Sequence, residues 1–200
     1  MERAIPSVLN QTYRNIELIV VGDCCTDDTE LKVEGLELER VRYFGLPASP
    51  RRPESGYDAW LVAGIDASNM GIRLSSGAWI VHLDDDDELV PEHVEVLLRF
   101  AQDNDLEMAY GKGLAVAGQG HRTELGSFPP ELGGLTHSGV LCSSRLKFLS
   151  YDRNAWRCLE PGDNLWRRMK EAGVRMGFLD RVLVVIYPAG PEAYRGIPRY

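Results

Sequence analysis

Four consecutive aspartates, Asp84, Asp85, Asp86 and Asp87, form the densest group of chemically useful side chains in the sequence, and Glu88 follows them directly. Neighbouring carboxylates repel one another by on the order of 1–4 kcal/mol per close pair, depending on the local dielectric. The run therefore needs either full solvation or a cation. Oxygen ligands at this density suit a hard divalent cation such as Mg²⁺ or Mn²⁺, completed by substrate phosphates. As a bare motif, the run fits a solvated acidic turn equally well.

A second acidic residue, Asp23, follows the apolar run at residues 16–21 and precedes a turn and a helix start at residues 26–28. The apolar run predicts a strand buried on both faces. Residues 78–83 predict another strand, which leads directly into the aspartate run. Ligands of open α/β sheets bind outside the carboxyl ends of the strands, so we expect these two acidic strand ends to share a crevice. Taken alone, Asp23 fits the shaping of a turn equally well.

The remaining sequence alternates between strand and helix patterns, with a loop-rich stretch at residues 118–134. Further strands are predicted at residues 41–46, 108–116 and 176–186, and helices at about residues 4–9, 59–75, 91–102 and 159–173. This alternation predicts an α/β fold with a mostly parallel sheet flanked by helices. We expect a single domain over residues 1–200, with a ligand-binding part at about 1–105 and a second side with closing elements at about 106–200.

The composition limits the classes of partner. A net charge of −8 argues against nucleic acid, because binding its phosphates needs clustered Lys and Arg. Four cysteines without a CxxC pair favour reduced thiols over a zinc site or a disulfide framework. No apolar run approaches the roughly 20 residues of a membrane span, and no signal-peptide pattern opens the sequence. We expect a cytoplasmic protein, either free or peripheral at a membrane.

Two groups of segments resemble glycosyltransferase family 2 in order and spacing. The first is SVLNQTYRNIELIVVGD at residues 7–23 with TDDT at 26–29, which is similar to the opening of that family. The second is NMGI at 69–72 with GAWI at 77–80 and LDDDD at 83–87, which is similar to the family's approach to its DxD motif. The resemblance covers roughly residues 4–100 well and continues more weakly beyond them.

The resemblance implies a GT-A fold and an inverting transfer of a sugar from a nucleoside diphosphate sugar, with a UDP-sugar favoured, to a glycan, lipid-carrier or protein acceptor. By similarity, Asp23 contacts the nucleotide base, Asp84 and Asp85 belong to the nucleotide site with Asp84 near the ribose, and Asp86 ligates Mn²⁺ or Mg²⁺ between the two phosphates. The metal would stabilise the departing diphosphate as a Lewis acid.

The resemblance also implies a catalytic base, which deprotonates the acceptor hydroxyl. Relatives place it in an acidic segment before a helix that reads roughly L-W-x-R, and the matching segment here is residues 160–168, EPGDNLWRR. Asp163 is the first choice and Glu160 the second. Capping of the helix N-terminus explains an acidic residue at either position as well.

Other polar and aromatic residues carry weaker expectations. His137 is placed on the acceptor or phosphate side, or else has a structural role. His82 lies inside a predicted strand and is expected to pack there or to support the site. Arg51 and Arg52 stand in a loop, where solvation is favoured over phosphate binding, and Trp166 fits a core face better than a sugar-stacking platform.

The sequence departs from the family pattern at three places. The strand and short loop that normally precede the helix at residues 4–9 are absent, so we expect a partner chain such as a second copy, a rearranged sheet, or reduced stability, because the neighbouring strand would have an unpaired edge. The letters GDCC at 22–25 replace the commoner D-D-G-S. Residues 184–188 contain no histidine to complete the metal site.

Two alternatives to an active transferase stay open. One is a truncated, weakly active or inactive protein that binds a sugar nucleotide. The other is an acidic Ca²⁺-binding or interaction module in which the aspartate run holds a structural ion. The paired motif at Asp23 counts against the second alternative, because a structural ion site needs no such partner motif.

Overall fold

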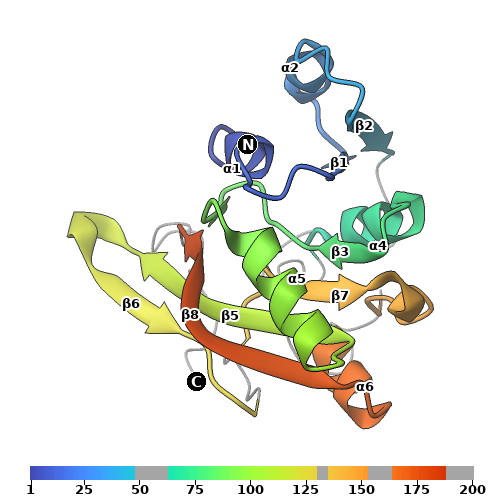
Figure 1. The fold of residues 1–200 in the computed structure, drawn as a ribbon. Helices are drawn as coiled ribbons and strands as arrows, with labels where there is room; N and C mark the ends of the chain where they lie inside the picture. The colour runs from blue at the N-terminus through green and yellow to red at the C-terminus, as the bar shows by residue number, and fades with distance from the viewer. Residues whose placement is uncertain (48–62, 130–134, 153–163, 188–200) are drawn as a thin grey trace.

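The computed structural model describes residues 1–47, 63–129, 135–152 and 164–187. The helices are α1 (Ala4–Leu9), α2 (Thr29–Glu34), α4 (Ile65–Leu74), α5 (His93–Asp103) and α6 (Asn164–Glu171), with 3-10 turns η1 (Gly118–Gly120) and η2 (Ser144–Leu146). The strands are β1 (Leu18–Asp23), β2 (Val41–Leu46), β3 (Trp79–Val81), β4 (Glu88–Leu89), β5 (Met108–Val116), β6 (Arg122–Leu125), β7 (Leu141–Ser143) and β8 (Met176–Ile186). Figure 1 shows their arrangement.

The strands form two separate sheets. Strands β1 and β2 pair in parallel as a two-stranded sheet, and the other six form a sheet with the order β3-β7-β5-β8-β4, in which β6 pairs with the free part of β5. In Figure 1 the β1–β2 pair and α2 lie beyond β3 and α4, apart from the larger sheet. The chain is therefore α/β, as predicted, with its strands divided between two units.

The prediction of a mostly parallel sheet is wrong for the larger unit. Only β5 and β8 pair in parallel there, and the pairs β3–β7, β4–β8, β5–β6 and β5–β7 are antiparallel. For β5 and β6 the short connection around η1 is the reason. Parallel strands need a crossover of a dozen or more residues, so strands joined by so few residues can only pair antiparallel. Strands β4, β6 and β7 span two to four residues, too few for a periodic pattern to appear in the sequence.

The core lies on the two faces of the larger sheet. Alternate residues of β5 point to opposite faces, so Met108 and Tyr110 pack with α4 and α6, whereas Ala109 packs with α5. Trp166 of α6 is buried in the first cluster, which confirms its predicted place in the core. Helices thus cover both faces of this sheet, and Figure 1 shows α5 lying across β5 and β8.

Strand β1 is less buried than its sequence predicts. Its residues are partly exposed except for Gly22, although residues 16–21 indicate a strand covered on both faces. Strand β1 begins at Leu18, so Glu17 precedes it and is not part of the strand. The difference arises because β1 has a hydrogen-bonded neighbour on one side only among the described residues, and a cavity adjoins its other side.

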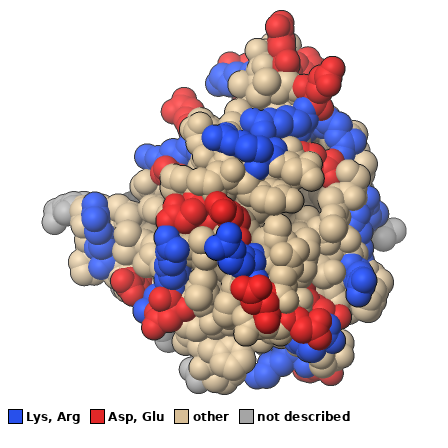
Figure 2. All heavy atoms as spheres, viewed as in Figure 1, with Lys and Arg blue, Asp and Glu red and all other residues tan. Residues whose placement is uncertain are grey.

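The surface carries both signs of charge. On the face seen in Figure 2, acidic and basic side chains are interspersed, and neither sign covers it alone. In the described part of the chain, no helix combines the length and the apolar character that a membrane crossing requires. Cys24, Cys25 and Cys142 are free thiols.

Candidate functional site

A cavity of about 720 Å³ lies between β1 and β3 and is lined by every residue of both strands. Asp23, the last residue of β1, and Asp84 and Asp85, which follow β3, line the same space. This acidic end of the cavity is called its mouth below. Asp27, from the turn after β1, joins them, and none of the lining residues in the described chain is Lys or Arg. The structure therefore brings together the two acidic strand ends, beside the N-terminal ammonium of Met1, which lies 3.9 Å from the Asp85 carboxylate.

The four aspartates of the run have different environments. Asp87 is buried, and its carboxylate accepts hydrogen bonds from the Ser138 hydroxyl at 2.5 Å and from the Tyr187 amide at 3.2 Å. Asp84, Asp85 and Asp86 are exposed. Burial raises the pKa of Asp87, although the bonds from Ser138 and Tyr187 oppose the rise. Asp87 thus shapes the turn, whereas the other three are exposed to solvent, with Asp84 paired to His137 and Asp85 to the N-terminal ammonium of Met1.

Ser138 fixes both ends of the acidic turn. Its hydroxyl, fully buried, donates to Asp87 and accepts a hydrogen bond from the Asp84 amide at 3.0 Å. The backbone of His82 is paired with Val140 and Gly139, whose segment contains Ser138. The turn at the end of β3 is therefore held by the segment that leads into β7.

His137, the neighbour of Ser138, forms an ion pair with Asp84 at the mouth of the cavity, with 2.9 Å between Nδ1 and Oδ1. Burial alone would lower the pKa of His137, but the hydrogen bond and negative charge of Asp84 outweigh it and raise that pKa. Burial would likewise raise the pKa of Asp84, and the bond from His137 reverses the direction. Each group thus stabilises the charged form of the other.

His82, the residue directly after β3, lies next to the ion pair between His137 and Asp84. Its ring meets those of His137, Tyr151 and Trp166 edge-on, with centroid distances of 5.5 to 5.8 Å. Burial is the main cause that lowers the pKa of His82 to about 3, so this imidazole is neutral near pH 7. The prediction that His82 packs behind the site agrees with this position, one residue beyond the strand.

Asp86, the predicted metal ligand, projects from the turn and does not line the cavity. Burial, followed by the negative charges of Asp85 and Asp84, raises the pKa of its carboxyl. Within the described ranges, no three His, Cys, Asp or Glu side chains are close enough together to hold a metal ion. The predicted bases Asp163 and Glu160, and also Arg51 and Arg52, lie outside the described residues.

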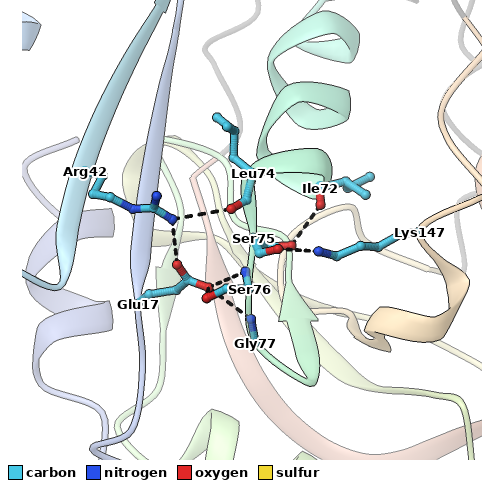
Figure 3. A network of polar contacts seen from close by, with 8 residues as sticks. All are labelled: Glu17, Arg42, Ile72, Leu74, Ser75, Ser76, Gly77 and Lys147. Carbon is cyan, nitrogen blue, oxygen red and sulfur yellow. Dashed lines mark hydrogen bonds and ion pairs between the residues drawn. The ribbon is translucent and has the colours of Figure 1, made fainter.

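Glu17 is a structural residue that the sequence reading missed. Its Oε1 accepts hydrogen bonds from the amide and hydroxyl of Ser76 at 2.6 and 2.7 Å and from the Gly77 amide at 3.0 Å, and its Oε2 pairs with Arg42 at 2.7 Å. Figure 3 shows this Glu17 network joining β2 to the turn between α4 and β3. Its signal in the sequence was a single charged residue in an otherwise apolar run.

Comparison with solved structures defines the class of fold. The chain superposes on the crystal structure of residues 1–349 of Staphylococcus aureus TarS in complex with UDP with a TM-score of 0.69 at 16% identity, covering 94% of this chain and 56% of that one. It also superposes on the same protein in complex with UDP-GlcNAc, with a TM-score of 0.65 and 17% identity over 93% of this chain and 54% of that one. This likeness establishes a GT-A fold.

Sequence comparison adds the family. The model for glycosyl transferase family 2 matches residues 61–158. Relatives include an uncharacterized glycosyltransferase of Rickettsia felis, 34% identical over 102 residues, and the putative colanic acid biosynthesis glycosyl transferase WcaA of Escherichia coli, 36% identical over 102 residues. A third is the GalNAc(5)-diNAcBac-PP-undecaprenol beta-1,3-glucosyltransferase of Campylobacter jejuni, 31% identical over 105 residues. The family model and these relatives support a glycosyltransferase family 2 protein.

The matches cover only part of these proteins. They span 50%, 50% and 52% of this chain, and 15%, 32% and 30% of the Rickettsia, Escherichia and Campylobacter relatives. The chain therefore spans between about one sixth and one third of their length.

Proposed function

We propose that the chain binds a nucleoside diphosphate sugar at the mouth of the β1–β3 cavity and transfers the sugar to an acceptor hydroxyl with inversion. The observation that supports this most is the shared position of Asp23 and Asp84, which lie at the ends of two strands and line one space. Similarity to glycosyl transferase family 2 over residues 61–158 supports the reaction class. TarS has been solved with UDP and with UDP-GlcNAc, which favours a uridine donor here.

A divalent metal ion held jointly by protein carboxylates and substrate phosphates suits this mouth. Carboxylates in the lining outnumber its positive groups, which are the N-terminal ammonium of Met1 and the imidazole of His137, so a cation would offset the repulsion between this lining and a diphosphate. Mg²⁺ and Mn²⁺ are often held by one or two carboxylates together with substrate phosphates. In this proposal Asp86, which lies outside the cavity lining, would hold the ion at the edge of the mouth together with a neighbour from the run that does line it, Asp84 or Asp85. When bound, the metal supplies Lewis-acid stabilisation of the charge on the departing diphosphate.

The chain's own residues orient the donor. In this proposal Asp23 contacts the nucleotide base, and Asp84 and Asp85 face the nucleoside side of the mouth. The ion pair with His137 keeps the carboxylate of Asp84 ionised and fixed in direction, so that it can accept a hydrogen bond from a ribose hydroxyl. Asp163, with Glu160 as the second choice, would take the proton from the acceptor hydroxyl.

Ligand-dependent thermal unfolding tests the donor site. The protein is unfolded with each of UDP, GDP, ADP and CDP, with and without Mn²⁺, as wild type, Asp86→Asn and Asp103→Asn. Asp103 is an exposed carboxylate at the end of α5 and serves as the matched control. A nucleotide at 100 times its Kd should raise the Tm by roughly 5–10 °C.

A rise that requires both Mn²⁺ and one nucleotide, and that Asp86→Asn alone abolishes, supports the proposal and identifies the base. A rise with metal alone, whatever the nucleotide, would replace it with a structural ion site. Turnover is then measured with the matching sugar nucleotide, and Asp163→Asn should lower kcat by at least about 100-fold. Donor binding without any turnover would instead indicate a sugar-nucleotide-binding protein.

A further inference from the structure

Strand β6 has a hydrogen-bonded neighbour on one side only. Among the described residues it pairs with residues 113–116 of β5 and with no other strand. Figure 1 shows the hairpin of β5 and β6 projecting at one side of the larger sheet. Arg122, Thr123 and Glu124 are all exposed. The outer edge of β6 is therefore accessible along these three residues, and its backbone groups can pair with an added strand.

The hairpin ladder shows which backbone groups of β6 point outward. The Ala117 amide donates to the His121 carbonyl at 2.9 Å, so these two residues form a hydrogen-bonded pair. Opposite residues of an antiparallel ladder alternate between hydrogen-bonded and non-hydrogen-bonded pairs. In the register of β5 and β6, Thr123 therefore bonds to β5, whereas the amides and carbonyls of Arg122 and Glu124 point away from it. The donors and acceptors of the outer edge belong to these last two residues.

The order Arg-Thr-Glu makes this edge complementary to itself. In an antiparallel pair of β6 strands centred on Thr123, Arg122 of each copy lies opposite Glu124 of the other. Both residues have outward backbone groups, so they can exchange amide-to-carbonyl hydrogen bonds in this register. The arginine–glutamate pairs and the central threonine pair are favourable cross-strand neighbours. A pairing centred on Arg122 or on Glu124 would instead place like charges opposite each other.

We propose that β6 is a self-recognition edge, through which two copies of this chain pair antiparallel about a two-fold axis at Thr123. Charges on an edge strand can block pairing, but here they oppose the registers centred on either charged residue and favour the one between them. Glu124 lies 3.1 Å from the Lys112 ammonium, and its side chain remains 56% exposed, so the arginine of a second copy can reach it. The larger sheets of both copies would then form one continuous sheet.

Sedimentation velocity tests the association. An isologous contact of this kind closes at a dimer. The wild-type protein should shift from monomer toward dimer as its concentration rises from about 10 to about 500 µM, because so short a ladder supports only a weak, transient interface. A monomer throughout this range would overturn the proposal, and so would growth beyond a dimer. Neither nucleotide nor metal is present, so the outcome is independent of the proposed transferase activity.

Two charge-reversal variants test the register. Arg122→Glu leaves only acidic residues at the contact and Glu124→Arg only basic ones, so each variant alone should associate at least about tenfold more weakly than wild type. Mixed in equal amounts, the two variants place opposite charges at both pairs and should regain about the wild-type association. A mixture that associates no better than either variant alone would refute pairing in this register.

Two further variants serve as controls. Asp103→Arg makes the same charge change as Glu124→Arg at an exposed site at the end of α5, and it should associate like wild type. The double variant Arg122→Glu/Glu124→Arg exchanges the two charges and should also associate like wild type. All variants alter exposed side chains, and their Tm should stay within about 4 °C of wild type. A loss of association in Asp103→Arg equal to that in Glu124→Arg would show that net charge governs it, and would overturn the proposal.

Hydrogen exchange locates the contact. In concentrated protein the amides of Arg122 and Glu124 should exchange about threefold or more slowly than in dilute protein. The amide of Thr123 already bonds to β5 and should change little. A dimer in which Arg122 and Glu124 gain no protection would place the contact elsewhere and overturn the role of β6.

Discussion

The β1–β2 pair and the six-stranded sheet contain strands of similar apolar composition but are buried to very different degrees. In the larger sheet, Leu141 and Leu183 are almost completely buried between helices. In β1, Leu18 and Val20 remain partly exposed beside a cavity. Apolar character alone therefore does not determine the burial of a strand, which depends on whether neighbours occupy both of its edges and both of its faces.

The two sheets are joined by side-chain hydrogen bonds in place of a strand ladder. At one end the Glu17 network connects Arg42 of β2 to Ser76 and Gly77 before β3. Elsewhere, the buried Gln11 donates to the Val90 carbonyl at 2.7 Å and accepts from the Val94 amide at 3.0 Å. The first set of contacts ties β2 and the start of β1 to the turn before β3, and the second ties the segment between α1 and β1 to the start of α5.

Replacing one leucine of each sheet with alanine should give the largest difference in the free energy of unfolding between the two sheets. Leu183→Ala should lower the free energy of unfolding by about 2–5 kcal/mol, because it opens a cavity in a closed core. Leu18→Ala should cost about 1 kcal/mol, since the side chain already borders open space and contributes mainly its partial burial. Urea unfolding of both variants measures the difference. Equal losses would mean that the β1–β2 unit is packed as tightly as the larger sheet.

Adding a methyl group gives a second matched comparison. In Gly111→Ala of β5, the new Cβ would lie 2.8 Å from the Arg181 carbonyl oxygen and 2.7 Å from Leu183. Backbone cannot move aside easily, so we expect a loss of about 1–3 kcal/mol. In Gly22→Ala of β1, the Cβ would meet the hydroxyl end of Tyr43 at 2.2 Å, and that ring tip can rotate away. A smaller loss for Gly22→Ala in thermal unfolding would support this, and a larger one would show that Tyr43 is held in place.

Long periodic elements could be predicted from the sequence, and contacts between distant segments could not. Strands β2, β5 and β8 have the predicted bounds, and α5 begins and ends within two residues of its prediction. The division into two sheets was not predicted as such, because each strand's own pattern says nothing of which edge remains unpaired. A rearranged sheet was only one of three outcomes expected from the unpaired edge of the first strand.

In the candidate site, too, contacts between segments far apart in the sequence could not be predicted. The aspartate run and Asp23 could be placed together because both follow strands. The separate role of Asp87 could not be foreseen, since it depends on Ser138 and Tyr187, which lie 51 and 100 residues away in the chain. Ser138 belongs to the weaker part of the family resemblance, which gives it no role, because a serine in a loop is ordinary.

Removing the Glu17 network should loosen the junction between the sheets. Glu17→Ala leaves the amides of Ser76 and Gly77 without their acceptor, so a loss of about 1–2 kcal/mol is expected. Hydrogen exchange should speed up in β1 and β2 and stay unchanged in Met108 and Ala109 of β5. Glu17→Gln keeps an acceptor and should show about half the effect. Uniform acceleration across both sheets would contradict the idea that they open separately.

The smallest expected effect is a pH dependence at the mouth of the cavity. Because Asp84 raises the pKa of His137 above its ordinary 6.5, the pair contributes stability that is fully present below pH 6.5 and is lost as the pH rises through the folded-state pKa of His137. The pKa of Asp84 is lowered from 3.8, so the stability that this carboxylate contributes is present above pH 3.8 and is lost as the pH falls through its folded-state pKa. The half-exposed Asp84 side chain keeps the contribution below about 1 kcal/mol.

His137→Gln isolates this contribution. His82 and His93, whose pKa values are lowered by burial to about 3 and about 4, have the opposite slope, because their unfolded forms bind more protons and stability is lost as the pH falls below 6.5. Subtracting the urea-unfolding free energies of wild type and His137→Gln at each pH cancels the contribution of His93 and, apart from its coupling to His137, that of His82. The difference should be largest near pH 5.5 and decline toward pH 8. A difference that is flat with pH would mean that His137 holds Asp84 by a neutral hydrogen bond.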